Sequence, residues 1–303
     1  MEKILKYLWL FVIATCLNAC NDEEALTPSG EELFPPKEQT ELDKQLAKMY
    51  SDYNTVIEYR YIKNLLPKDW YYITPVSIDY VLPMAQFLKD MWIAPLEAGS
   101  SKAFVQAHFP RMIVLVGSPA YQKDGSVVLG QAEGGTLIRF TEVNYYSETS
   151  RNWKQGQLET AFHEYAHLLH QTFNLPDAFR QVTPDAYTKN GWMAVTSSEA
   201  LKRGMVSPYA TSAFAEDFAE IFSFYLSATD EELDYYFNQQ PVNSAQDVDL
   251  NKGRALLMTK LNILVKFLDG IGMDIDKIRE DLQNKLDNLD TVSYTHLRAH
   301  ETD

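Results

Sequence analysis

The spacing of apolar and polar positions changes along the chain, from strand-like in the first half to helical in the second. Short runs of β-branched and aromatic residues predict strands at 55–62, 112–118, 127–130 and 136–146, with a turn at 123–126. Apolar residues at helical spacing predict helices at 40–53 and 79–93, the second ending near Pro95, and then at about 153–173, 197–203, 213–228, 230–239, 246–268 and 273–290. Strands followed by helices favour an α+β fold, with a small mixed sheet lobe before a mostly helical lobe.

The first 38 residues predict a secretory leader followed by a tether. Lys3 and Lys6 precede an apolar stretch at 8–14 that is too short to span a membrane. The stretch leads to "LNAC", residues 17–20, and resembles a bacterial lipoprotein signal. That resemblance implies a signal peptide at 1–19 and a lipid on Cys20 as the first residue of the mature chain; the alternative is an ordinary secretory signal. Residues 20–38 are polar, acidic and proline-containing, which is typical of a flexible tether.

The acidic residues that follow Cys20 resemble the surface-export signal of Bacteroidetes lipoproteins. Together, these resemblances imply a protein anchored by lipid at the cell envelope, at the outer membrane and exposed on the cell surface. Both cysteines, Cys16 and Cys20, lie in this N-terminal segment, so the sequence predicts no disulfide and no cysteine metal site in the body.

The last twelve residues, "VSYTHLRAHETD" at 292–303, follow an amphipathic helix and have no pattern of their own. They resemble translated sequencing-adaptor read-through, and we exclude them from the domain, which we place at 39–291. The exclusion matters because His296 and His300 lie four residues apart and imitate a metal-binding pair. The whole chain has a formal net charge of −15, which disfavours nucleic acid as a partner.

The segment "TAFHEYAHLLHQ", residues 160–171, contains the H-E-x-x-H pattern of zinc peptidases. Positions four apart lie on one face of a helix, so His163 and His167 can point at one ion. Glu164 lies about 100° around the helix from His163, beside such an ion, where it can accept a proton from water. The alternative is a buried helix with hydrogen-bonded histidines. His170 is about 10.5 Å along the axis from His163; all three histidines cannot share an ion, and we expect a hydrogen-bonded structural role for His170.

A catalytic zinc site needs a third protein ligand and an open fourth position. The predicted helix after Ser212 contains three carboxylates in five residues: Glu216, Asp217 and Glu220. Burying them among aromatic residues would be costly without a cation, which zinc would supply. The alternative is a solvated acidic face.

The chain resembles gluzincin-type zinc peptidases, in which a glutamate on a helix downstream of H-E-x-x-H is the third ligand. One branch has a tyrosine, a glutamate seven residues later and another four after that, and Tyr209, Glu216 and Glu220 have this spacing. The resemblance implies one Zn²⁺ ligated by Glu216 with the two histidines. It also implies that Glu220 orients a ligating histidine and that Tyr209 stabilises the oxyanion of the reaction.

The layout of lipobox, H-E-x-x-H and "EDFAE" resembles zinc metallohydrolase lipoproteins of Bacteroidetes, which accompany TonB-dependent uptake systems. The resemblance implies a zincin-like domain that cleaves peptide bonds of a peptide or protein substrate with metal-activated water. Two alternatives stay open: a non-catalytic surface binding lipoprotein on the same scaffold, and a zinc amidase acting on a non-protein substrate. For the substrate-binding edge strand we select "TLIRF", 136–140; the alternative is an interior strand with Leu137 or Ile138 in the core.

Overall fold

The computed structural model describes residues 39–122, 127–128, 130–133 and 136–300. The predicted signal peptide, Cys20 and the tether lie outside this part of the chain, as does the predicted turn at 123–126. The elements described below belong to one compact unit at 42–303, except that the first helix begins one residue earlier, at Glu41. Within the described residues, no helix combines the length and the apolar character needed to cross a bilayer.

A four-stranded mixed sheet forms the first part of the domain, as the sequence predicts. Its strands β1 (Val56–Glu58), β2 (Met112–Leu115) and β6 (Leu137–Phe140) are parallel, and β5 (Gly130–Glu133) pairs antiparallel with β6, in the order β1-β2-β6-β5. The short strands β3 (Ala120–Tyr121) and β4 (Val127–Val128) form a separate antiparallel pair.

The selection of "TLIRF" as an edge strand was wrong. β6 lies between β2 and β5, and Ile138 is fully buried, as the alternative of an interior strand required. The strand is also shorter than predicted, because the chain turns at Glu142, which has a φ of 62°, into a 3₁₀ turn over Val143–Tyr145. Strand β5 is the edge strand on this side of the sheet.

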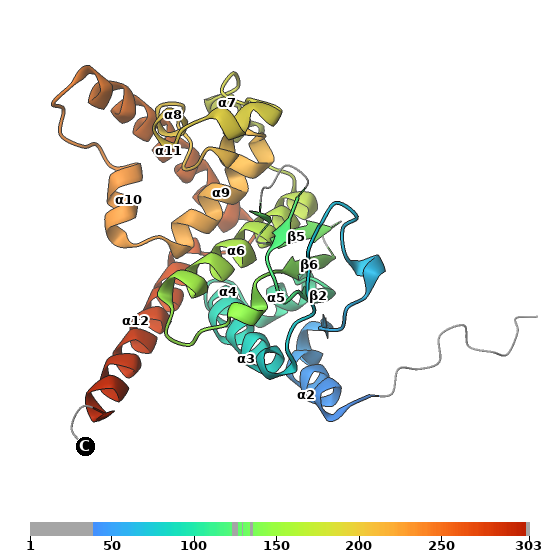
Figure 1. The fold of residues 1–303 in the computed structure, drawn as a ribbon. Coiled ribbons are helices and arrows are strands. Elements are labelled where there is room, and N and C mark those ends of the chain that lie inside the picture. Colours follow the sequence, from blue (N-terminus) through green and yellow to red (C-terminus); the bar gives the residue numbers. More distant parts are fainter. Residues whose placement is uncertain (1–38, 123–126, 129, 134–135, 301–303) are drawn as a thin grey trace, which may run out of the picture. The chain divides into compact units, whose positions relative to one another are not determined.

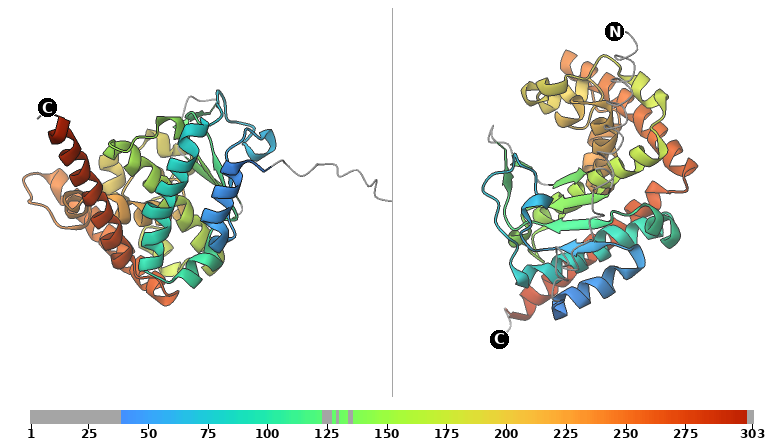
Figure 2. Two further views of the ribbon diagram at one scale, coloured as in Figure 1. Left: turned by 90° about the horizontal axis from the view of Figure 1, so that it is seen from below. Right: turned by 90° about the vertical axis from the view of Figure 1, so that its right-hand side faces the viewer.

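Helices α2 (Glu41–Tyr50), α3 (Ile78–Leu88), α4 (Ala94–Ala98) and α5 (Lys102–His108) belong to the N-terminal half. The prediction that a helix ends near Pro95 was wrong, because a π-helical turn over Lys89–Ile93 joins α3 to α4 and the helix continues to Ala98. A wider turn directly before the proline makes room for its ring in a helix. The right-hand view of Figure 2 shows the sheet between these blue and teal helices and the yellow-green α6.

Helix α6 (Arg151–Phe173) links the sheet to the helical half of the domain (Figure 1). It begins where Ser150 accepts a hydrogen bond from the backbone of Trp153. On one side α6 packs against β5 and β6, and on another against α9 (Phe214–Ser227). The buried ring of Trp92 contacts both Phe140 of β6 and Tyr165 of α6. These contacts hold the H-E-x-x-H helix at the junction of the two lobes, as predicted.

The remaining helices are α7 (Asp177–Val182), α8 (Ser197–Lys202), α10 (Asp230–Phe237), α11 (Ala245–Gly270) and α12 (Ile275–His300). The sequence did not predict α7, a short helix in a segment interrupted by prolines. The backbone of α12 continues through 292–300, beyond the predicted end at 290. The interpretation of 292–303 as read-through concerns the origin of these residues and stays a prediction.

Candidate metal centre

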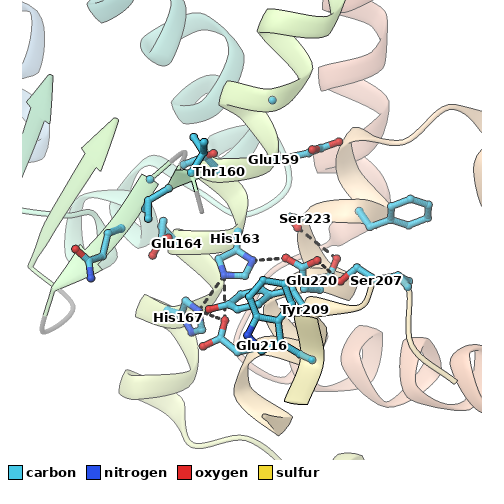
Figure 3. Close-up of a pocket in the computed structure, with 18 of the residues that line it drawn as sticks. Glu159, Thr160, His163, Glu164, His167, Ser207, Tyr209, Glu216, Glu220 and Ser223 are labelled. Carbon is cyan, nitrogen blue, oxygen red and sulfur yellow. Dashed lines mark hydrogen bonds and ion pairs between the residues drawn. The ribbon is translucent and has the colours of Figure 1, made fainter. Parts of the chain in front are cut away.

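Two helices bring two histidines and one glutamate together. His163 and His167 lie one turn apart on α6, with their Nε2 atoms 3.1 Å apart. From α9, Oε2 of Glu216 lies 3.2 Å from Nε2 of His163 and 3.1 Å from Nε2 of His167. Figure 3 shows the three side chains pointing at one another. Within the described residues, this is the one group of three potential ligands whose ligand atoms lie close enough to share an ion.

The spacing of these three atoms fits a zinc ion. Zinc binds imidazole nitrogen and carboxylate oxygen at about 2.0–2.1 Å in tetrahedral geometry, which places neighbouring ligand atoms about 3.3–3.4 Å apart. The observed separations of 3.1–3.2 Å therefore approximate one face of such a tetrahedron. An ion held by these three residues would keep its fourth position for another molecule, which is the pattern of catalytic zinc sites.

The outward nitrogen of each histidine has its own partner. Nδ1 of His163 lies 2.9 Å from Oε1 of Glu220, whose other oxygen accepts a hydrogen bond from Ser207 at 2.5 Å. Nδ1 of His167 lies 2.9 Å from Nε2 of His170. Protons on the two Nδ1 atoms would leave both Nε2 lone pairs directed at the shared point. His170 is thus hydrogen bonded, as expected, and burial followed by the effect of His167 lowers its pKa, so it can accept as a neutral ring.

The cluster favours positive charge at its centre. Burial alone would lower the pKa of His163, but Glu216 and Glu220 outweigh burial and raise it to about 10. Burial would likewise raise the pKa of Glu216, but hydrogen bonds to the two histidines hold it well below its usual value. The site therefore stabilises a carboxylate and a cation in contact, which is the arrangement that a bound metal ion requires.

Glu164 and Tyr209 approach the same point from different sides. Glu164 is 8% exposed and lies on the side of α6 that faces the sheet (Figure 3). Tyr209 begins a 3₁₀ turn, Tyr209–Thr211, with its ring 6.1 Å from the imidazole of His163 and 5.0 Å from the ring of Trp192. Partial burial and the surrounding carboxylates raise the pKa of Tyr209, so its hydroxyl keeps its proton and remains a hydrogen-bond donor.

A cleft of about 860 Å³ contains all six residues that the sequence selected in the body: His163, Glu164, His167, Tyr209, Glu216 and Glu220. Cys20 lies outside the described residues. The edge strand β5 contributes Gly130 and Gln131 to the wall. Gly130 is needed for close packing, because a Cβ at this position would lie 2.1 Å from Cγ2 of Thr160 on α6.

Asp217, the remaining carboxylate of α9 that the sequence analysis singled out, turns away from the histidines. It is fully buried and pairs with the equally buried Lys260 of α11 at 2.6 Å, and it accepts a hydrogen bond from Tyr187. Lys260 also donates to the carbonyl of Gly204. The cation that neutralises Asp217 is therefore a lysine and not a metal ion. Lys260 was missed in the sequence analysis. It could have been recognised as a buried lysine because it lies three residues after Leu257 and four before Leu264, the spacing of core positions on a helix.

The fold and the site together define a class. A mixed sheet is followed by helices, and two histidines of one helix meet a glutamate of a second in a cleft, which is an arrangement that can hold a metal ion. A family model described as "Putative zinc-binding metallo-peptidase" matches residues 35–276, and the chain belongs to this family. The family is described as zinc-binding, and the two histidines with Glu216 offer a place for the ion.

A solved structure has the same fold. The crystal structure described as a "putative zinc-binding metallo-peptidase" from Bacteroides caccae aligns with a TM-score of 0.66 and 23% sequence identity, covering 85% of this chain and 96% of that one. This similarity extends the shared architecture over nearly the whole solved chain. No curated protein matches the chain.

Proposed function

We propose that the protein is a zinc-dependent hydrolase that cleaves peptide bonds of a peptide or protein substrate. The supporting observation is the combination of a three-ligand set with Glu164 and Tyr209 in one cleft. Binding a metal ion requires neither of these two residues, whereas hydrolysis uses both a proton acceptor and a donor to the oxyanion.

The proposed roles follow from the positions of the side chains. His163, His167 and Glu216 would hold one Zn²⁺, and Glu220 and His170 would orient the two imidazoles. The ion, when bound, supplies a Lewis acid and a nucleophile that is active at neutral pH. Glu164 accepts a proton from the attacking water and returns it to the leaving amine. Tyr209 donates a hydrogen bond to the oxyanion that develops on the substrate carbonyl.

Strand β5 would align an extended substrate. Within the described residues its outer edge pairs with no further strand, and Gly130 and Gln131 face the cleft. A peptide that adds to this edge by backbone hydrogen bonds would lie across the ligand cluster. This assignment replaces β6, which the sequence favoured.

A peptide library incubated with wild type and with Glu164→Gln tests the proposal. We expect cleavage by the zinc-loaded wild type and a loss of at least about 100-fold in rate in the variant, since general acid–base catalysis contributes at least that much. Equal cleavage by both proteins would reject the assignment of Glu164 and indicate a contaminant. Zinc binding without cleavage of peptides would favour either a binding lipoprotein or an amidase with a non-protein substrate, which a library of acylated amino sugars and amines would separate.

We further propose that a lipid on Cys20 anchors the domain at the cell envelope, on the outer membrane and facing outward, near components of a TonB-dependent uptake system. The support for the anchor is the sequence of residues 1–38, and the support for the uptake system is the layout of lipobox, H-E-x-x-H and "EDFAE" along the sequence. Cys20→Ala should move the protein from the membrane fraction to the soluble fraction and abolish labelling by a radioactive fatty acid. Retention of both properties would refute the anchor.

A further inference from the structure

One carboxylate in the cleft, Glu159, has no role in the proposed metal binding or catalysis. Glu159 lies one helical turn before His163 on α6 and lines the same cleft. In Figure 3 its side chain points to the same side of α6 as Glu220 and Ser223 of α9, whereas Glu164 lies on the opposite side of His163. Glu159 therefore marks the part of the cleft that runs between α6 and α9.

Glu159 has no cationic partner within the described residues. It accepts one hydrogen bond from the amide of Gln155 at 3.1 Å. By contrast, Glu216 contacts both histidines, and Glu220 contacts His163 and Ser207. Burial, with the nearby Glu220 and Glu232, raises the pKa of Glu159. The ionised form of Glu159 is therefore less stable than that of an exposed glutamate, and a bound cation would stabilise it.

The charge of the whole cleft favours the same ligand. Its described lining contains four glutamates and neither lysine nor arginine. One divalent ion would cancel two of these four negative charges and leave the cleft negative. An anionic substrate side chain would be repelled near Glu159, and a neutral one would leave the carboxylate without a counter-charge.

The lining of the cleft suits a long side chain. At Gly156, one turn before Glu159, a Cβ would meet no atom within 4 Å, so the helix surface is open there. Val206 and Phe224 add apolar surface to the lining. Lysine and arginine place an apolar stem along such surface and a cation at its end.

We propose that Glu159 is a specificity residue that binds the cationic side chain of an arginine or lysine in the substrate. This inference rests on the proposed peptidase function and adds the class of substrate. The carboxylate would accept charge-assisted hydrogen bonds from the guanidinium or ammonium group. The enzyme would therefore act on basic peptides.

The test uses peptide hydroxamates, which bind through the ligand cluster without being cleaved. Three compounds differ in one side chain: arginine, its neutral isostere citrulline, and norleucine. We expect zinc-loaded wild type to bind the arginine compound at least about tenfold more tightly than the citrulline compound by calorimetry. The Glu159→Gln variant should bind the arginine and the citrulline compounds with equal affinity. Glu231→Gln, which removes the same charge from an exposed position on α10, should keep the wild-type preference.

The outcomes separate this inference from the function on which it rests. Equal binding of the arginine and citrulline compounds by wild type, or an unchanged preference in Glu159→Gln, overturns the role of Glu159 and leaves the metal site intact. Zinc-loaded wild type that binds no hydroxamate overturns the proposed function and the inference together. Zinc content and melting temperature of Glu159→Gln, measured beside wild type, verify that the variant is folded and loaded.

Discussion

Replacing Glu220 by glutamine isolates the contribution of one hydrogen-bonded charge to metal affinity. The substitution keeps the shape of the side chain but removes the negative charge 2.9 Å from Nδ1 of His163. It also leaves one acceptor oxygen for two donors, Nδ1 of His163 and the hydroxyl of Ser207, which donates to Glu220 at 2.5 Å. A neutral amide polarises the imidazole less, so His163 becomes a weaker ligand. Loss of such a supporting group typically lowers metal affinity about 10- to 100-fold, equal to about 1.4–2.7 kcal/mol.

The same free energy should appear in thermal stability. A ligand that binds only the folded state stabilises it in proportion to the logarithm of its affinity, so saturating zinc should stabilise Glu220→Gln by about 1.4–2.7 kcal/mol less than wild type. For a domain of this size, that difference lowers the zinc-induced rise in melting temperature by about 3–11 °C. The assay is differential scanning calorimetry with and without zinc, beside a chelator competition that measures the dissociation constant.

Two results would contradict this reasoning. One is a zinc dissociation constant in Glu220→Gln within about twofold of wild type. The other is an equal fall in melting temperature with and without zinc, which would assign Glu220 a purely structural role. Glu231→Gln on α10 is the matched control, because it removes the same charge from an exposed residue outside the lining of the cleft and should leave both measurements unchanged.

Three further substitutions test the cluster and its surroundings. Glu216→Ala should reduce zinc content from about one ion per chain to a small fraction by plasma mass spectrometry, and full retention in a folded variant would reject Glu216 as a ligand. His170→Phe keeps a ring but removes the partner of His167, and zinc affinity should fall about tenfold by chelator competition; an unchanged value would refute the role of His170. Lys260→Met should destabilise the fold by about 3–5 kcal/mol in urea at pH 8, because Asp217 stays buried without its cation. The loss should shrink toward pH 4: burial raises the pKa of Asp217 to about 6 even beside Lys260, so without the lysine the folded state binds the extra proton and stability falls as pH rises. Adding Asp217→Asn should restore most of the stability at pH 8, and failure to do so would contradict the charge argument.

Much of the fold followed from local pattern. The helix around His163 was predictable because its capping residue, its length and its apolar positions are local features of the chain. The neighbouring positions of His163 and His167 follow from the helical period alone, and so does the place of Glu164 beside them. Strands β1, β2 and β6 and the later helices were located for the same reason, although β6 is shorter and α12 longer than predicted, whereas β3 and β5 were not predicted.

Features that depend on packing partners could not be predicted from the sequence. The helix continues past Pro95 because a π-helical turn precedes it, and β6 is interior because β5 folds back beside it. The spacing of apolar residues predicts neither feature, since an edge strand and an interior strand of this length have similar apolar patterns.

The difference between what the sequence determines and what the tertiary structure determines is clearest for the three carboxylates of α9. The sequence by itself determined that the helix after Ser212 places three carboxylates within five residues, and that two histidines face one point on an earlier helix. Only the tertiary structure decided which carboxylate meets them. Neighbouring residues point about 100° apart around a helix, so when α9 packs on α6 with Glu216 toward the histidines, Asp217 must enter the core. There Lys260, more than forty residues along the chain, supplies its counter-charge.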